Sequence, residues 1–369
     1  MLIGICGAIC AGKQSVANYL IQTHDFTPLS MKRPSPTPAI EKSADLCDVP
    51  SSTPSSSPAT TSATTITTAT PQPIEFENVN ALDEHVSRDW RTNFVLTTIW
   101  NESILDHLQK RPYFIFMSID APTGLRWQRF RARCAQHNQE APTLEDFVIR
   151  SDEHVYDTTN NGSSAGSASL VALSARAQIR IVNSASEMST LNASLEALNL
   201  LDPARLRPTW DQYFMQLADL AARRSNCMRR QVGCVLVREK RVISTGYNGT
   251  PRNVTNCNDG GCPRCNTSIG RGGAALSTCL CLHAEENALL EAGRERIGDA
   301  AVLYCNTCPC LTCSVKIVQV GITEVVFSQS YHMDVESAKI FQQAGVRLRQ
   351  FSPVSGTIPL QKEKKAEKA

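Results

Sequence analysis

The sequence has almost no imbalance of charge and no long apolar run. Its 369 residues include 37 Lys plus Arg and 35 Asp plus Glu, a formal net charge of +2. A nucleic-acid-binding protein usually shows a basic stripe, so no such partner is expected. No apolar run reaches the roughly 18 residues that a membrane span needs, and no basic residues precede the apolar start at 2–10, as a secretory signal would require. We therefore predict a cytoplasmic protein, with access to the nucleus left open.

Two stretches lack the apolar residues from which a core is built. Residues from about 31 to 73 are mostly Ser, Thr, Pro and Ala, and residues from about 157 to 170 are rich in Asn, Gly and Ser. Such segments cannot bury enough surface to fold, so both are predicted to be disordered insertions. The remainder predicts two α/β domains at 1–200 and 210–352, joined by a linker at 201–209 and followed by a charged, flexible tail at 353–369.

Cysteine, in contrast, is abundant. Fifteen Cys in a chain with no recognisable secretory signal favour reduced thiols and metal ligands over disulfides. His283 is followed two residues later by Glu285, and a Pro-Cys-x-x-Cys segment contains Cys310 and Cys313. One imidazole and two thiolates fill three zinc positions and leave a fourth open for water, whose pKa the ion lowers. With Glu285 to carry protons, this is the known signature of zinc-dependent nucleobase deaminases.

The residues around this signature predict its secondary structure. The apolar run at 288–290 indicates a helix with His283 and Glu285 in its first turn, and a second helix begins at Cys310 and ends before Gly321. A helix N-terminus favours negative charge and so helps to keep thiols ionised. Short strands are expected at 301–304 and 324–327. Helix and strand therefore alternate, which is typical of an α/β domain with parallel strands.

Two other interpretations of these cysteines remain open. Cys305 and Cys308 form a second Cys-x-x-Cys pair just upstream and are alternative ligands, although only Cys310 follows a proline and opens the helix. A purely structural zinc knuckle would also pair cysteines, but it does not require a Glu two residues after the His.

Further segments of residues 210–352 resemble deoxycytidylate (dCMP) deaminases, the fungal form above all, within the zinc-dependent cytidine/deoxycytidylate deaminase family. Besides the two zinc motifs, the segments that carry this resemblance are Ser-Asn-Cys at 225–227, Gln-Val-Gly-Cys at 231–234, Gly-Tyr-Asn-Gly-Thr-Pro at 246–251 and Ser-Tyr at 330–331. The resemblance implies a three-layer α/β/α domain that converts dCMP to dUMP and ammonia and so feeds dTTP synthesis. It also implies a homo-oligomer, usually a hexamer, activated by dCTP and inhibited by dTTP.

The same resemblance implies roles for individual residues. His283, Cys310 and Cys313 would bind the catalytic zinc, and Glu285 would move protons. Asn248 would hold the deoxyribose or phosphate of the substrate, and Tyr331 would close the nucleotide pocket. Ser225 and Arg229 are our candidates for the phosphate, although an exposed loop charge explains Arg229 equally well.

A second group of cysteines lies ahead of the catalytic helix. Some members of the family carry a structural zinc in this region, which implies ligation by Cys227, Cys257 and Cys281 with Cys265, or alternatively Cys262 or Cys279, as the fourth ligand. Such a site would hold together the polar segment 253–277, which has few apolar residues of its own. The alternative is a set of free, partly buried thiols.

The N-terminal domain begins with a buried strand and a phosphate-loop pattern. Gly7 to Lys13 match G-x-x-x-x-G-K, with Gly12 as the second glycine, and a helix follows; strand, glycine loop and helix are the context of a P-loop. In outline this resembles the nucleotide-kinase fold, dephospho-CoA kinase especially. However, Gln14 stands where a kinase needs Ser or Thr for magnesium. We therefore predict a degenerate kinase-like domain for assembly or nucleotide sensing.

Other functions remain as alternatives. A bifunctional deaminase and P-loop kinase would need Lys13 for phosphoryl transfer. A zinc deaminase that acts on another cytosine nucleotide or on nucleic acid is a second alternative, and a zinc scaffold without catalysis is a third. A polynucleotide substrate would need a basic or aromatic approach surface, for which the two Arg-Arg pairs at 223–224 and 229–230 are too few.

Overall fold

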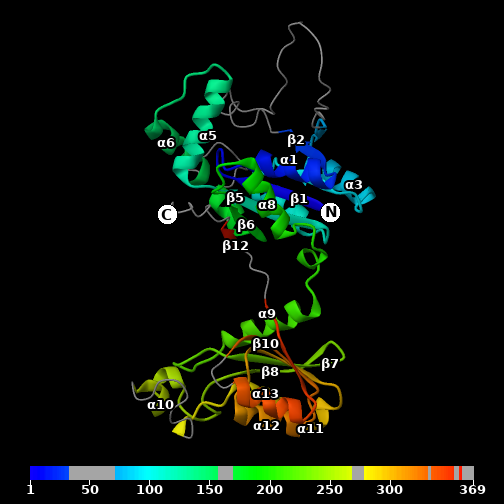
Figure 1. Ribbon diagram of the computed structural model, residues 1–369, viewed down its shortest axis with the longest axis vertical. Helices are drawn as coiled ribbons and strands as arrows, with labels where there is room; N and C mark the ends of the chain where they lie inside the picture. The colour runs from blue at the N-terminus through cyan, green and yellow to red at the C-terminus, as the bar shows by residue number, and fades with distance from the viewer. Residues whose placement is uncertain (33–70, 157–168, 268–277, 331–333, 353–356, 360–369) are drawn as a thin grey trace, which may run out of the picture. The chain divides into compact units, whose positions relative to one another are not determined.

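The computed structural model describes residues 1–32, 71–156, 169–267, 278–330, 334–352 and 357–359 (Figure 1). The chain divides into two compact units. The first comprises Met1–Arg207 with the end of the chain, and the second comprises Pro208–Val354. Both are mixed α/β, as predicted. No helix in the described ranges combines the length and the apolar character needed to cross a membrane.

The N-terminal unit is built on a parallel sheet. Its seven strands run in the order β12-β6-β5-β1-β4-β2-β3, and every pair is parallel. Strand β1 lies in the middle of the sheet. All of its residues are buried, as expected for a parallel strand that is covered on both faces. The strands are β1 (Leu2–Gly7), β2 (Thr27–Met31), β3 (Ile74–Phe76), β4 (Phe94–Leu96), β5 (Phe114–Asp120), β6 (Ile179–Val182) and β12 (Thr357–Pro359).

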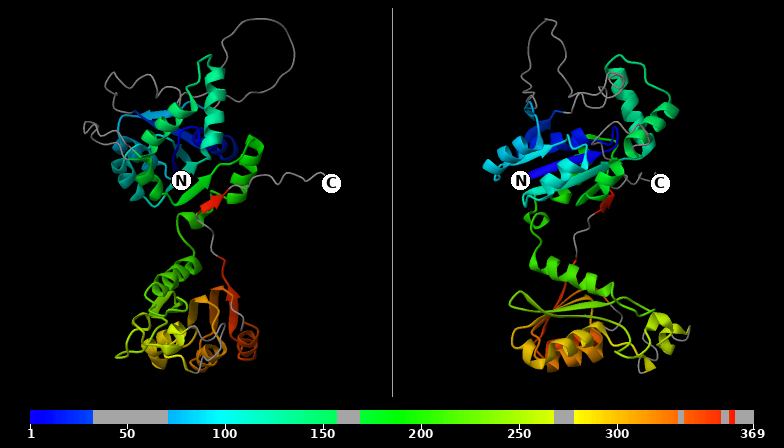
Figure 2. Two further views of the ribbon diagram at one scale, coloured as in Figure 1. Left: turned by 90° about the vertical axis from the view of Figure 1, so that its left-hand side faces the viewer. Right: turned by 180° about the vertical axis from the view of Figure 1, so that it is seen from behind.

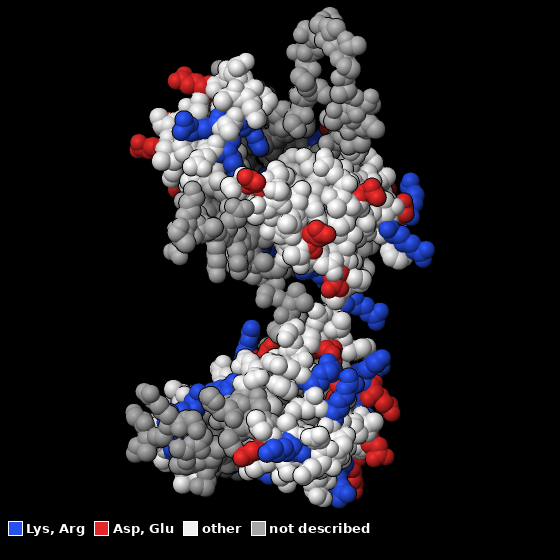
Figure 3. Space-filling model, in the orientation of Figure 1, with Lys and Arg blue, Asp and Glu red and all other residues white. Residues whose placement is uncertain are grey.

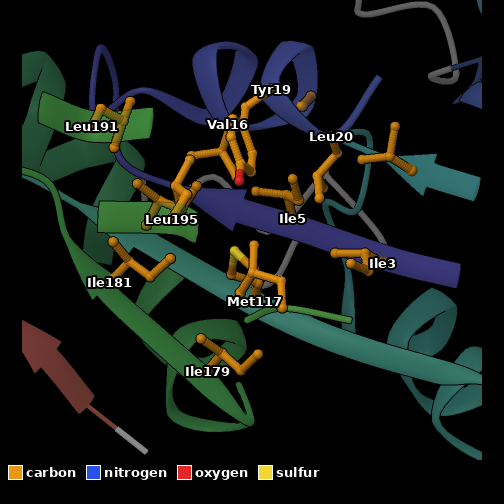
Figure 4. Close-up of a cluster of buried hydrophobic side chains, with 14 of the residues drawn as sticks. Ile3, Ile5, Val16, Tyr19, Leu20, Met117, Ile179, Ile181, Leu191 and Leu195 are labelled. Carbon is orange, nitrogen blue, oxygen red and sulfur yellow. The ribbon is translucent and has the colours of Figure 1, made fainter. Parts of the chain in front are cut away.

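Helices cover both faces of this sheet, since parallel strands need crossover connections. Ile3 and Ile5 of β1 pack with α1 (Lys13–His24) and α8 (Met188–Leu198) in one cluster (Figure 4). Leu2 and Cys6 point to the opposite face and pack in a second cluster. The helices of that second face are α3 (Val79–Arg88), α4 (Glu102–Gln109) and α7 (Leu170–Ala175). The remaining pair, α5 (Thr123–Gln136) and α6 (Leu144–Tyr156), pack through Phe130 and Phe147.

The end of the chain differs from the prediction. Residues 357–359, expected in a flexible tail, form β12 and pair in parallel with β6, so this part of the tail completes the edge of the N-terminal sheet. The predicted insertions fall almost wholly outside the described residues, but their limits are narrower than predicted: Met31 ends β2 and Leu170 begins α7. The predicted linker contains a short 3-10 helix, η1 (Pro203–Arg205).

The C-terminal unit has a five-stranded mixed sheet in the order β11-β10-β9-β7-β8. The strands are β7 (Gly233–Arg238), β8 (Arg241–Tyr247), β9 (Val302–Thr307), β10 (Glu324–Gln329) and β11 (Arg347–Gln350). The parallel pairing predicted around the two motifs is confirmed for β9 and β10. Strand β7 is antiparallel to β8 and to β9, which the sequence did not predict.

Three layers result from helices on both faces (Figures 1 and 2). Val235 and Val237 of β7 pack against α9 (Trp210–Ala222), whereas Cys234 and Leu236 face the other way, toward α11 (Ala284–Ile297). The other elements are α12 (Leu311–Gln319), which packs on the same face as α11, α13 (Asp334–Gln343), and the short η2 (Cys257–Asp259) and α10 (Pro263–Asn266). The predicted α/β/α arrangement of this unit is confirmed.

Candidate active site

His283 stands at the N-cap of α11, at the position where the sequence pattern placed a helix start. The Glu286 carboxylate accepts a hydrogen bond of 3.1 Å from the His283 backbone N–H, as in a capping box. Glu286 is itself paired with Lys316 of α12. The residue before His283, Leu282, exchanges two backbone hydrogen bonds with Gly249. His283 is therefore fixed from the helix side and from the chain that leads into it.

Cys310 occupies the N-cap of α12, and Cys313 lies in the first turn. Both sulfurs are 3.3 Å from His283 Nδ1, and the three ligand atoms all lie within 4.8 Å of one another. Two helix starts thus converge on one point, each supplying ligands from its first turn. The hydrogen bond between the thiols lowers the pKa of Cys310 to about 3 and raises that of Cys313, so at least one sulfur is ionised at neutral pH.

This donor set fits zinc. In a tetrahedral site with Zn–S near 2.3 Å and Zn–N near 2.0 Å, adjacent nitrogen and sulfur ligands are about 3.5 Å apart. The two observed nitrogen–sulfur distances of 3.3 Å are close to this value. Among the residues that the structure describes, the set has three protein ligands. Three ligands are typical of catalytic zinc sites, where the fourth position takes water or substrate.

Glu285 follows His283 by two residues and is almost fully buried, with 4% of its surface exposed. It is not part of the ligand group formed by the imidazole and the two thiols. Burial raises the pKa of Glu285 to about 7, because the charged carboxylate loses its contact with water. A carboxyl group with a pKa near neutrality can both take up and release a proton.

Cys305 and Cys308, the alternative ligand pair, lie elsewhere. Cys305 is a fully buried residue of β9 and is paired in register with Cys234 of β7. Cys308 donates its backbone N–H to the Gln329 carbonyl. Among the described residues, neither sulfur belongs to a group that could hold a metal ion. The geometry therefore favours Cys310 and Cys313.

Comparison with known proteins agrees with this geometry. Residues 208–329 match the family described as the cytidine and deoxycytidylate deaminase zinc-binding region. The deoxycytidylate deaminase of Schizosaccharomyces pombe is 43% identical over 356 residues, which cover 96% of this chain and 99% of that protein. The Saccharomyces cerevisiae deoxycytidylate deaminase is 48% identical over 294 residues, covering 75% and 89%.

The chain belongs to the deoxycytidylate deaminase family. Its C-terminal unit contains the zinc-binding region of that family, so zinc is its cofactor. Among solved structures, the dCMP deaminase of cyanophage S-TIM5 in complex with dCMP and dUMP is 31% identical; the match covers 39% of this chain and 98% of that one, with a TM-score of 0.33.

Two of the predicted substrate residues, Asn248 and Ser225, form hydrogen bonds with the backbone of the protein itself. The Asn248 amide accepts from Val232 N–H at 2.8 Å and donates to the Arg230 carbonyl at 2.7 Å. The Ser225 hydroxyl donates to the Asn248 carbonyl at 2.8 Å. Because a side-chain amide offers two donors and two acceptors, Asn248 retains one of each for a ligand.

Arg229 and Tyr331 are placed differently. Arg229 is exposed and donates to the carbonyls of Arg264 and Thr267, at 3.3 and 2.6 Å, in and just after α10. Its guanidinium therefore braces the cysteine-rich segment. Tyr331 lies outside the described residues.

The sequence analysis did not single out Thr250. Its buried hydroxyl has no hydrogen-bond partner among the described residues. The only signal in the sequence is that a polar residue stands at this position of Gly-Tyr-Asn-Gly-Thr-Pro.

The four cysteines predicted to form a structural site come together. Cys227, Cys257, Cys265 and Cys281 form one group in which all four sulfurs lie within 4.8 Å of one another. Three of these side chains are buried and Cys227 is half-buried. Cys262 and Cys279, the alternatives for the fourth ligand, lie in an overlapping group with Cys265 and Cys281.

The predicted phosphate loop of the N-terminal unit lines a cavity of about 430 Å³. Gly12 precedes α1 with φ of 111°, a left-handed conformation that favours glycine. Lys13, Arg129 and Arg133 line the same cavity. Gln14 donates to the Asn18 side chain at 2.9 Å, so the structure holds an amide where a magnesium-binding hydroxyl would be needed. Gly7, at the end of β1, has no room for a side chain because a Cβ would lie 2.2 Å from the Ile119 carbonyl oxygen.

Proposed function

We propose that the C-terminal unit catalyses the zinc-dependent hydrolysis of dCMP to dUMP and ammonia and so supplies dUMP for dTTP synthesis. The observation that carries this is the convergence of His283 Nδ1 with the sulfurs of Cys310 and Cys313, beside the buried carboxyl of Glu285. The substrate is inferred from the relatives: the two yeast proteins that match most of this chain are named deoxycytidylate deaminases.

In this mechanism His283, Cys310 and Cys313 would hold the zinc ion, which when bound would supply Lewis acidity and make a water molecule nucleophilic near neutral pH. Glu285 accepts a proton from the attacking water and delivers it to N3 of the cytosine ring. Once the water oxygen is bonded to C4, Glu285 takes the remaining proton of this new hydroxyl and delivers it to the amino group. The C4–N bond then breaks, ammonia leaves, and the C4–O bond becomes the carbonyl of uracil. Burial of Glu285 excludes bulk water, which would otherwise compete for these protons.

The contacts around Asn248 support a role in substrate binding. Its amide holds residues 230–232 against the end of β8 and still has one donor and one acceptor free. We propose that these groups bind the deoxyribose or phosphate of dCMP. Ser225 would position this turn and contribute to the phosphate site together with Arg229, and Tyr331 would close the site.

A substitution of Glu285 tests the mechanism. Glu285→Gln keeps the size of the side chain but removes the proton carrier, so kcat on dCMP should fall by about 10²–10⁴ while zinc is retained, since a general acid/base contributes about this much. Glu291→Gln, an exposed position on the same helix, is the matched control and should keep normal activity. A Glu285→Gln enzyme with normal kcat would contradict the proposed role.

Substrate choice is tested by comparing dCMP with deoxycytidine and CMP. A phosphate site predicts a strong preference for dCMP over deoxycytidine. Equal rates on both would contradict the assignment of dCMP. Adding dCTP or dTTP to the same assay tests the regulation that the family resemblance implies, activation by the first and inhibition by the second. By the same resemblance we expect a homo-oligomer, most simply a hexamer. We expect the protein to act in the cytoplasm, with access to the nucleus left open.

For the N-terminal unit we propose a non-catalytic role in assembly or nucleotide sensing. The cavity at the loop has cationic side chains suited to phosphates, but Gln14 cannot replace the hydroxyl that orders magnesium. The purified protein should therefore show no ATP hydrolysis or phosphoryl transfer, and Lys13→Ala should leave dCMP deamination unchanged when no other nucleotide is added. ATP hydrolysis that Lys13→Ala abolishes would instead establish a bifunctional enzyme.

The surface charge favours a small substrate over nucleic acid. On the face drawn in Figure 3, Lys and Arg are interspersed with Asp and Glu on each unit, in keeping with the net charge of +2. A polynucleotide would need a continuous basic path to the site.

A further inference from the structure

Six cysteine side chains form one cluster beside the candidate active site. Four are buried and two are half-buried, and all are free thiols. They come from four short stretches of chain, and the cluster that they form consists of cysteines alone. They are Cys227, Cys257, Cys262, Cys265, Cys279 and Cys281.

The cluster contains two complete four-sulfur groups that overlap. Cys227 and Cys257 belong only to the first group, and Cys262 and Cys279 belong only to the second. Cys265 and Cys281 belong to both. A single tetrahedral zinc would use four sulfurs and leave two thiols beside it without a metal. Two tetrahedral zinc ions that share two sulfurs need six thiolates, which is the number present.

We propose that these six cysteines bind two zinc ions, with the sulfurs of Cys265 and Cys281 bridging them. This site is separate from the catalytic zinc and independent of the proposed reaction. The sequence led us to expect a single structural zinc with four cysteine ligands. The proposal goes beyond it because Cys262 and Cys279 are both ligands, of the second ion.

The sulfur–sulfur distances agree with this arrangement. Two sulfurs on one tetrahedral zinc with Zn–S near 2.3 Å are about 3.8 Å apart. The shared edge, Cys265 to Cys281, measures 3.9 Å. In the first group, Cys227 lies 3.9 Å from Cys265. In the second, Cys279 lies 3.7 Å from Cys265 and 3.9 Å from Cys262. These four distances match the edges of a zinc tetrahedron, and the other sulfurs of each group lie within 4.8 Å of one another.

The surroundings suit a site with excess negative charge. Six thiolates and two zinc ions carry a net charge of −2, which hydrogen-bond donors must offset. The backbone N–H of Met228 donates to Cys257 Sγ at 3.5 Å, and that of Leu280 donates to Cys262 Sγ at 3.4 Å. The Arg264 guanidinium interacts with the thiols of Cys279 and Cys265. Two of the four outer sulfurs, those of Cys257 and Cys262, therefore accept backbone hydrogen bonds of the kind that thiolates accept.

The position of the cluster indicates what the two ions would do. Cys281 lies two residues before His283, and the intervening Leu282 is bonded to Gly249. At the other side of the cluster, Cys227 donates its backbone N–H to Ser225 Oγ. Metal binding to a preformed site stabilises only the folded chain. The two ions would therefore hold in place the two segments that lead from the cluster to the candidate active site, 225–227 and 281–283.

Metal counting tests the proposal without reference to activity. The full chain should contain three zinc ions per chain, and Cys310→Ser, which removes the catalytic ion, should contain two. Two ions in the full chain and one in Cys310→Ser would show a single four-cysteine site and overturn the proposal. Cys10→Ser, a half-buried thiol of the N-terminal unit, is the matched control and should leave the count unchanged.

Bridging is tested on the same Cys310→Ser protein by zinc X-ray absorption. Shared thiolates bring the two ions close together, so the spectrum should show sulfur neighbours only, together with zinc–zinc scattering. Sulfur neighbours without a zinc–zinc contribution would overturn the bridged arrangement. Neither measurement alters a residue of the cluster, so neither depends on whether a cluster variant folds.

Discussion

Gly246, at the end of β8, lets the catalytic helix lie close to the sheet. A Cβ at this position would lie 2.1 Å from the Ala284 carbonyl oxygen and 2.5 Å from the Ala288 backbone nitrogen. Both atoms belong to the backbone of α11, so no side-chain rotation can relieve the clash. Gly246→Ala must therefore push α11 away from the sheet.

The size of the effect follows from these distances. Non-bonded atoms normally approach to about 3.5 Å, so the helix must move by about 1 Å. Overpacking of this kind costs about 1–3 kcal/mol of stability, which for a unit of this size lowers Tm by roughly 2–4 °C per kcal/mol. His283 and Glu285 move with α11 while Cys310 and Cys313 stay on α12. A misplacement of about 1 Å at reacting groups can cost about 100-fold in rate, so we expect kcat to fall by that order.

Two other glycines provide controls for the assay, which measures dCMP deamination, zinc content and Tm. Gly233→Ala creates the same clash with α9, since its Cβ would lie 2.0 Å from the Ala218 carbonyl oxygen, but α9 carries no candidate catalytic residue. It should lower Tm similarly and leave kcat of the folded protein nearly unchanged. Gly124→Ala, which meets nothing within 4 Å, should change neither. Normal kcat in Gly246→Ala, or equal kcat losses in Gly246→Ala and Gly233→Ala, would refute this reasoning.

Further predictions concern two carboxylates. Burial alone would raise the pKa of Asp83, but hydrogen bonds from Arg111, His107 and Tyr113 hold it at about 2. Asp83 therefore stabilises the fold by about 2 kcal/mol above pH ~4, and this is lost as the pH falls toward ~2. Asp83→Asn should lower the free energy of unfolding by about that amount at pH 7 and much less at pH 2; an equal loss at both would contradict the assignment. Glu286→Ala should lose about 1 kcal/mol and bind zinc less tightly, because the His283 N–H loses its acceptor. Glu286→Gln should restore both, as measured by Tm and zinc content after dialysis.

The chemistry of the site was largely predictable because its parts are local. His283 and Glu285 lie in one helix turn, as do Cys310 and Cys313, so short-range pattern and helix-start signals identify them together. The parallel pair β9 and β10 was predictable for the same reason, since apolar runs alternate with helices around these motifs.

Other elements carried no comparable signal. The β7–β8 hairpin turns through Glu239 and Lys240, both with positive φ, whereas the usual sequence signal for such a turn is Asn or Gly. Residues 357–359 pair with β6, about 175 residues earlier in the chain, and nothing in their neighbourhood predicts a strand. In the N-terminal sheet, β4 rather than β2 lies beside β1, a choice that depends on how distant strands and helices pack.

By itself, the sequence determined the α/β class and the family, and it predicted the zinc ligands and the proton carrier proposed here. These depend on residue type and on spacing within a few helical turns. Only the tertiary structure decided that Cys265 and Cys281 are shared by two sulfur groups, that Arg229 braces α10, and that Asn248 is half engaged by the backbone. Those contacts join residues 16 to 38 positions apart, and such pairings are set by the packing of the whole unit, not by local preference.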